Sequence, residues 1–113
     1  MAYNTIKENL LPPKYYSNEK LQNVNAIAVH WTAGAGGDAE TLYNWYVYGN
    51  HNYEVNCHYA IGLSGQVIRY VPEQNVSWCT NSANNETISI EVCNVDKDNK
   101  SGTWTDATYD SLI

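Results

Sequence analysis

The sequence contains no phenylalanine, although it carries ten tyrosines and four tryptophans in 113 residues. It is also poor in positive charge, with six lysines and arginines against twelve acidic residues and a net charge of −6. Proteins that bind nucleic acid need a basic surface, and adhesion to an anionic membrane also needs basic residues. The charge balance therefore argues against both kinds of partner.

Long hydrophobic runs are missing as well, so no segment is expected to span a membrane. The first ten residues, MAYNTIKENL, lack the pattern of a signal peptide, which predicts synthesis in the cytoplasm without export by a leader. The three cysteines, Cys57, Cys79 and Cys93, form no CxxC pair, which excludes a zinc ribbon. Their odd number favours free thiols.

The length suits a single domain, residues 1–113, in which residues 1–23 are expected to form a polar arm broken at LPPKYY. Hydrophobic patterning predicts strands over residues 24–31, 57–63, 66–72 and 86–94. Ser64 and Gly65 are expected to join the second and third strands as a hairpin. Strands interleaved with helices predict an α/β domain.

Two helices are expected. The first covers residues 38–50, with Asp38 as its cap and with Leu42, Trp45 and Tyr46 on one face. The second begins at Thr105 and places three side chains at helical spacing: Tyr109, Leu112 and Ile113. No C-cap glycine follows them, so the pattern predicts a domain truncated within its last helix. Self-association through this bare helix face is a further expectation.

Three strands divide their side chains in the same way, with large apolar residues on one face and small or polar residues on the other. If the large residues line the core, then His30, His58 and Glu91 share an open face. Small neighbours would leave room there for a ligand: Ala28, Ala60 and Gly62. A glutamate inside an apolar strand needs a specific reason, because burying an unpaired charge is costly.

Each of these polar residues also has a purely structural explanation. His30 could be a hydrogen-bonded residue at a strand end, and Glu91 could form an ion pair with Arg69 or a lysine. His58 could be structural or line the groove, whereas His51 is expected at the surface. Adjacent strand residues face opposite ways, so Cys57 and His58 cannot form a nucleophile–base pair. Cys93 shares the face of Glu91 and could contact a metal.

Three ordered stretches, IAVHWTAG, CHYAIGLSGQVIRYVPEQNVSWC and ETISIEVCN, resemble the type 2 N-acetylmuramoyl-L-alanine amidases. These are the zinc-dependent amidases of phage endolysins, bacterial autolysins and peptidoglycan recognition proteins. The resemblance covers residues 24–113. It implies an α/β fold with a mixed central β-sheet flanked by helices, and Zn²⁺ as the cofactor. It also implies cleavage of the amide that joins N-acetylmuramic acid to L-alanine of the stem peptide.

The resemblance assigns roles to five residues. His30 matches the first zinc ligand of the family, and Glu91 matches the glutamate that acts as general base and acid. Thr32, His58 and Trp78 fall in the blocks that line the substrate groove. Cys57 stands where one branch of the family has a catalytic tyrosine, which favours the glutamate branch. The other two zinc ligands of the family come after the last helix, so His30 alone is present.

These features predict the N-terminal portion of an amidase catalytic domain, with peptidoglycan as its partner. The absence of a signal peptide favours a phage or prophage endolysin, which acts on the bacterial cell wall after release. The alternative is a non-catalytic peptidoglycan-binding module, or an inactive fragment of such an amidase.

Overall fold

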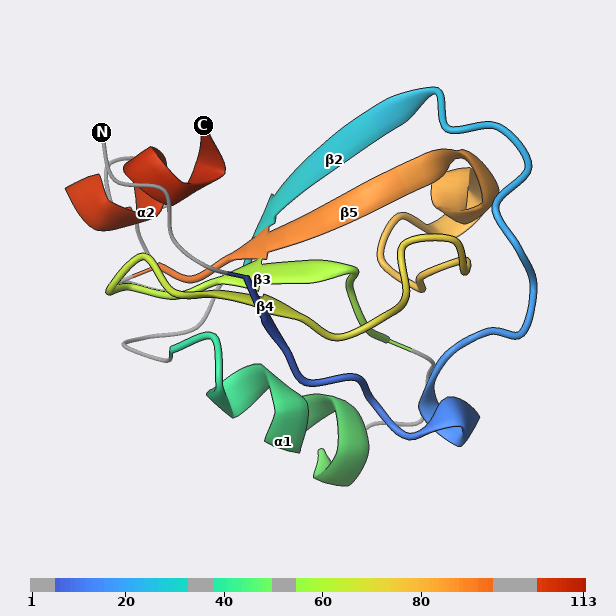
Figure 1. The fold of residues 1–113 in the computed structure, drawn as a ribbon, viewed down its shortest axis with the longest axis horizontal. Helices are drawn as coiled ribbons and strands as arrows, with labels where there is room; N and C mark the ends of the chain where they lie inside the picture. Colours follow the sequence, from blue (N-terminus) through green and yellow to red (C-terminus); the bar gives the residue numbers. More distant parts are fainter. Residues whose placement is uncertain (1–5, 33–37, 50–54, 95–103) are drawn as a thin grey trace.

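The computed structural model describes residues 6–32, 38–49, 55–94 and 104–113. Five strands in these ranges form one sheet in the order β1-β4-β3-β5-β2 (Figure 1). Only β3 and β4 run antiparallel, and the other neighbours are parallel. The predicted mixed sheet is therefore confirmed. The strands are β1 (Ile6–Glu8), β2 (Ala26–Trp31), β3 (Tyr59–Ile61), β4 (Val67–Arg69) and β5 (Thr87–Val92).

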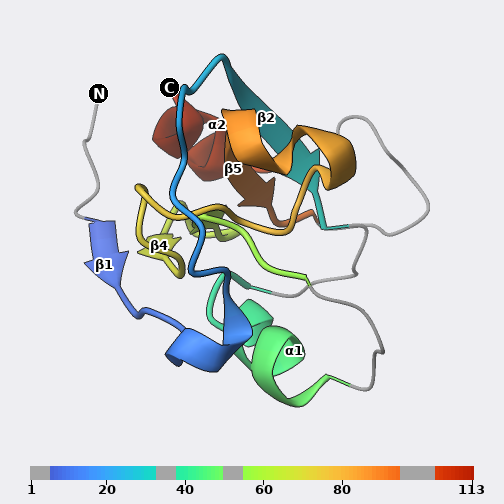
Figure 2. The same cartoon turned by 90° about the vertical axis from the view of Figure 1, so that its right-hand side faces the viewer.

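The helices lie on both sides of this sheet. Figures 1 and 2 show α1 (Thr41–Tyr48) on one side and α2 (Asp106–Leu112) on the other. Two short 3-10 helices, η1 (Pro13–Tyr15) and η2 (Asn81–Glu86), lie in the connections before β2 and β5. None of the described helices is long and apolar enough to cross a membrane.

The hairpin and the cap of the last helix are confirmed. The Gly62 amide donates to the Gln66 carbonyl over 2.8 Å, and Gly65 takes a φ of 84°, which glycine adopts without steric cost. Thr105 caps α2, because its Oγ1 accepts a hydrogen bond from the Thr108 amide at 3.1 Å. The same hydroxyl donates to the Leu63 carbonyl at 2.6 Å. The last helix is thereby fastened to the hairpin.

The expected cap of the first helix is wrong. α1 starts three residues after Asp38, and the Asp38 carboxylate accepts hydrogen bonds from the amides of Ala39 and Leu63 instead. That carboxylate also fills the space beside Gly62, where any side chain would clash with it. The apolar face of α1 is shifted too, since Tyr46 is buried but Trp45 is 41% exposed.

The N-terminal arm is part of the domain rather than an appendage. β1 pairs with β4 and forms one edge of the sheet. Leu11 is only 1% exposed, and its amide donates to the Tyr70 carbonyl at 2.9 Å. The side chain of Leu11 belongs to the same buried cluster as Tyr46, Ala60 and Tyr70. The expectation of a peripheral arm is therefore wrong for the described residues 6–23.

The assignment of the two sheet faces needs a partial correction. The large residues Ile61, Ile88 and Val92 are buried as expected. Ile27 and Val29 in β2, expected in the core, are 66% and 44% exposed. The small face is the one that packs against α1, and Ala60 on it is completely buried. The reason is that α1 and the segment around Leu11 cover the small face over β3 and β4. Only the outer part of this face, along β5 and the edge strand β2, remains accessible.

Burial falls from the middle of α2 to the end of the chain. Thr108 is completely buried, Leu112 is half-buried, and Ile113, which follows α2, is 90% exposed. The Tyr109 side chain, which was expected on the same apolar face, lies outside the described part of the chain. Self-association through this face therefore stays a prediction.

Candidate active site

The two residues expected at the centre of the site lie side by side. His30 is in β2 and Glu91 is in β5, and the parallel register pairs them directly. Residues paired in this way point to the same face of the sheet. Both side chains are half-buried, so a ligand can still reach them. The expectation that His30 and Glu91 share a face is thus confirmed by the register.

A third group, Cys79, completes this cluster. One ligand atom each from His30, Cys79 and Glu91 lies within 4.8 Å of the other two. Sequence reasoning missed Cys79, because it lies in the loop after Trp78, where no strand or helix period places a side chain. The sequence shows only that Cys79 stands twelve residues before Glu91, in a stretch with no regular pattern. This spacing does not indicate that the two side chains meet.

The environment of Glu91 changes its acidity. Burial raises the pKa of the Glu91 carboxyl to about 7, while a hydrogen bond from the Cys79 thiol at 3.5 Å lowers it in part. Burial, and next the charge of Glu91, raise the pKa of Cys79 to about 12. The alternative of a structural ion pair with Arg69 is wrong, because Arg69 pairs with Glu8 at 2.9 Å. Glu91 therefore has the acidity of a group that exchanges protons near neutral pH.

His58 is a structural residue, and its expected place in the substrate groove is wrong. The side chain is completely buried, and both ring nitrogens have backbone partners. Nε2 donates to the Asn75 carbonyl at 2.7 Å, while Nδ1 accepts from the Ser89 amide at 3.1 Å. These partners require the neutral ring, and burial lowers the pKa of His58 from 6.5.

We therefore expect His58 to make folding sensitive to acid. Because its pKa is lower in the folded state, its contribution is complete above pH about 6.5 and is lost as the pH falls through the folded pKa. Glu91 acts in the opposite direction, since its folded pKa is raised. Glu91→Gln removes this opposing effect, so the two proteins to compare are Glu91→Gln and the double variant Glu91→Gln/His58→Gln. The free energy of unfolding of each is measured in urea between pH 8 and pH 5. Equal loss of unfolding free energy on acidification in both proteins would contradict this role.

The remaining candidates are two of the cysteines, Cys57 and Cys93, and His51. The three cysteines are free thiols, as expected. Cys57 is completely buried and accepts a hydrogen bond from the Tyr46 hydroxyl at 3.2 Å, so it is no nucleophile for an external substrate. Cys93, which could have contacted a metal, is buried and is not a member of the cluster around Glu91, whereas Cys79 is. His51 lies outside the described residues.

Trp78 and Thr32 lie next to the cluster in the chain. Trp78 directly precedes Cys79, its side chain is half-buried, and its amide donates to the Asn56 side chain at 2.7 Å. Thr32 follows β2, where its hydroxyl donates to the Asn94 side chain at 2.9 Å. The Thr32 oxygen retains a lone pair with which it can accept a hydrogen bond from a ligand.

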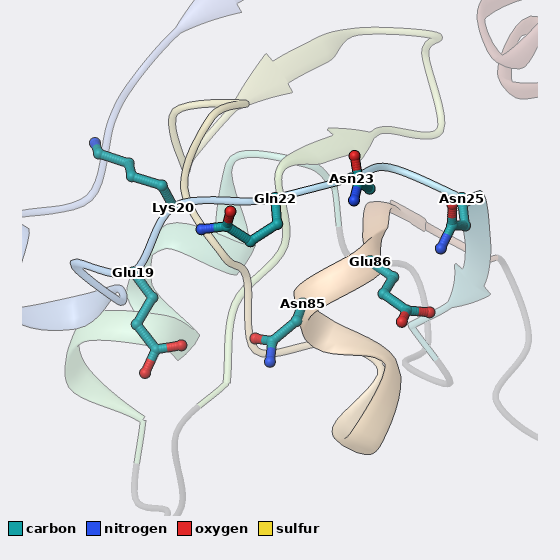
Figure 3. A pocket seen from close by; sticks show the side chains of 7 residues that line it. All are labelled: Glu19, Lys20, Gln22, Asn23, Asn25, Asn85 and Glu86. Carbon is teal, nitrogen blue, oxygen red and sulfur yellow. The ribbon is translucent and has the colours of Figure 1, made fainter.

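A cavity of about 580 Å³ lies elsewhere, near the amino ends of β2 and β5 (Figure 3). No histidine, cysteine or aromatic ring lines it, so it offers neither a soft metal ligand nor a stacking surface. The His30–Cys79–Glu91 cluster is therefore a better candidate for the active site than this cavity. Its lining is entirely polar: Glu19, Lys20, Gln22, Asn23, Asn25, Asn85 and Glu86.

The sequence model of the N-acetylmuramoyl-L-alanine amidase family matches residues 20–113. The chain belongs to this family. No curated protein matches the amidase chain, whereas several solved structures share its fold. One of them is the structure of PlyL, whose sequence is 24% identical to this one. The two structures superpose with a TM-score of 0.68, over 88% of this chain and 63% of the PlyL chain. This amidase chain thus spans less than two thirds of the PlyL chain.

Two other solved structures resemble the amidase chain more fully. The endolysin amidase LysCS from Clostridium intestinale is 18% identical with a TM-score of 0.72, over 98% of this chain and 70% of that one. A selenomethionine AmpD derivative is 21% identical with a TM-score of 0.71, over 95% of this chain and 69% of that one. At these identities the likeness confirms the fold of the amidase chain, including its mixed sheet.

The His30–Cys79–Glu91 cluster has a donor set that fits zinc. Imidazole nitrogen, thiolate sulfur and carboxylate oxygen are the three ligand types that Zn²⁺ takes in proteins. The first two are offered by His30 and Cys79, and the Glu91 carboxyl lies within 4.8 Å of both ligand atoms. Since its three side chains are half-buried, a ligand can reach the cluster, while His30 and Glu91 are held on adjacent strands of the sheet.

Proposed function

We propose that this chain is a zinc-dependent peptidoglycan hydrolase, which cleaves the amide between N-acetylmuramic acid and L-alanine of the stem peptide. The observation that carries the proposal is the pairing of His30 with Glu91 on adjacent strands. A metal-binding imidazole thereby stands next to a carboxyl group whose pKa is about 7. We further propose that the protein is a phage or prophage endolysin that acts on the bacterial wall after release.

The roles in this proposal follow from the chemistry of amide hydrolysis. A zinc ion held by His30, when bound, would polarise the amide carbonyl and lower the pKa of water. Glu91 takes the proton of the attacking water on a carboxylate oxygen. It then returns this proton to the nitrogen of the departing L-alanine. A pKa of about 7 suits both steps, because the group must accept and donate the same proton near neutral pH.

Substrate contacts are proposed for Trp78 and Thr32. The half-buried Trp78 ring provides an aromatic surface next to Cys79, on which a sugar ring or a peptide can pack. The Thr32 hydroxyl is held by Asn94 at the end of β2, two residues after His30. Both residues are neighbours in the chain of residues in the His30–Cys79–Glu91 cluster, which supports this proposal.

The direct test is to incubate the chain with purified peptidoglycan and Zn²⁺, followed by product analysis. New free amino groups on L-alanine, without new reducing sugar ends, would support amidase activity. Binding to peptidoglycan without any release of amines would instead favour the non-catalytic binding module. Release of reducing ends alone would contradict the proposed bond specificity.

We expect Trp78→Ala to weaken binding of a soluble muropeptide about tenfold, which corresponds to ~1.4 kcal/mol. The melting temperature should change little, because the ring is not fully buried and the backbone contacts with Asn56 remain. Calorimetric titration measures the affinity, and Tyr48→Ala, an exposed aromatic residue of α1, is the control. A stability loss of about 3–5 kcal/mol, as for a core aromatic residue, would make Trp78 a packing residue instead.

A further inference from the structure

We propose that Cys79 is a metal ligand of this chain, and that its thiolate binds the same ion as His30. The inference rests on the proposed function in that it names a second residue holding the metal of that site. It goes beyond that function, because neither the strand pattern nor the resemblance pointed to Cys79. The ion expected from a thiolate–imidazole pair is a thiophilic divalent cation such as Zn²⁺ or Co²⁺.

The distances carry the first step. The Cys79 sulfur lies 3.5 Å from a carboxylate oxygen of Glu91 and within 4.8 Å of a ring nitrogen of His30. Zinc–sulfur and zinc–nitrogen bonds are about 2.3 and 2.0 Å long, so two atoms that share an ion can be no more than about 4.3 Å apart. Because the sulfur and the ring nitrogen are within 4.8 Å, a side-chain rotation that brings them closer would let both bind one ion.

The loop that carries Cys79 is held in place by side chains. The amides of Cys79 and Thr80 both donate to the Asn84 side-chain oxygen, at 3.1 and 2.7 Å. On the other side is Asn56, which is completely buried. Its side-chain oxygen accepts a hydrogen bond from the Trp78 amide, and its backbone amide donates one to the Trp78 carbonyl. Cys79 is thus held from both sides by asparagines. A metal ligand fixed in this way loses little freedom on binding.

The other two thiols of the chain do not offer the same chemistry. Cys57 is completely buried and hydrogen-bonded to Tyr46, and Cys93 is buried outside the cluster. Only Cys79 among the three is partly exposed. This difference makes the proposal testable, because the three sulfurs differ in exposure.

Metal binding would also rearrange the contact between Cys79 and Glu91. Without metal, the Cys79 thiol donates a hydrogen bond to the Glu91 carboxylate. When the sulfur coordinates an ion, the thiol proton leaves to solvent and the hydrogen bond is lost. The Glu91 carboxylate then stands beside the ion without a thiol donor. The same binding event would therefore free the proposed base for a water molecule.

The test uses cobalt as a spectroscopic probe on the whole reduced chain. We expect Co²⁺ to produce a thiolate-to-cobalt charge-transfer band in the near ultraviolet. Cys79→Ser should abolish this band and weaken Co²⁺ binding at least tenfold, whereas the matched variant Cys93→Ser should keep the band. Circular dichroism checks that each variant folds. Retention of the band in Cys79→Ser, or Co²⁺ binding without any band, would overturn the proposal.

A second measurement needs no variant. Iodoacetamide reacts with the thiolate, and burial raises the pKa of the Cys79 thiol, so alkylation of the metal-free chain is followed at alkaline pH. Under the same conditions Zn²⁺ should slow alkylation of Cys79 at least tenfold, as mapped on peptides by mass spectrometry. Unchanged alkylation of Cys79 at a Zn²⁺ concentration that saturates the chain would overturn the proposal. Wall cleavage is assayed separately. Cleavage without protection of Cys79 would leave the amidase function standing, while protection without cleavage would leave the ligand assignment standing.

Discussion

Glu91→Gln is expected to lower amide cleavage by about 100-fold or more while metal stays bound. The amide side chain of glutamine keeps the size of glutamate but cannot accept the proton of the attacking water. His30 and Cys79 are unchanged in this variant, so their side chains still face the same space. The loss should therefore appear in catalysis rather than in metal content.

The measurement is the rate of amine release from purified cell walls, together with metal content after dialysis. Glu86→Gln, an exposed glutamate just before β5, is the matched control and should keep the parental rate. Activity of Glu91→Gln within about tenfold of the parent would remove Glu91 from its role as base.

The sequence predicted the elements well because their signals are local. Alternating apolar residues gave β2 and β5 within two residues, and Ser64–Gly65 gave the hairpin between β3 and β4. The Thr105 cap was also found, since an N-cap depends on its own hydroxyl and an amide three residues away. These features need no knowledge of the rest of the chain.

The covering of the small face, and the exposure of the large face at β2, could not be predicted from the same pattern. Alternation separates Ile27 from Ala28, but it does not say on which side the covering helix packs. Here α1 covers the small face, where Ala60 allows close approach, and leaves Ile27 exposed. His58 was misplaced for the same reason, because the face expected to be open is closed over β3.

Within the site, two of the three clustered residues were predictable. His30 and Glu91 lie in strands, so their period places them on one face. Cys79 lies in a loop whose position depends on Asn84 and Asn56, and on contacts spanning up to 22 residues. A side chain positioned by such contacts leaves no periodic signal. Loop ligands are therefore found from the structure alone.

Leu11→Ala is expected to destabilise the protein by about 2–5 kcal/mol, the usual cost of truncating a buried leucine. Leu11 is 1% exposed and packs in the cluster that joins α1 to the sheet. Domains of this size have a total stability of about 5–15 kcal/mol, so the loss would be a large fraction of it. The neighbouring Leu10, which is 39% exposed, provides a matched control.

Urea unfolding of Leu11→Ala and Leu10→Ala measures the difference directly. The amidase family match begins at residue 20, so Leu11 lies outside the segment that defines the family. If both substitutions cost equally little, residues 6–19 would be a peripheral arm, as the sequence suggested. A large cost at Leu11 alone would show that this segment supports α1. Since Tyr46 of α1 packs in the same cluster, wall cleavage should then fail at a lower temperature in Leu11→Ala than in the parent.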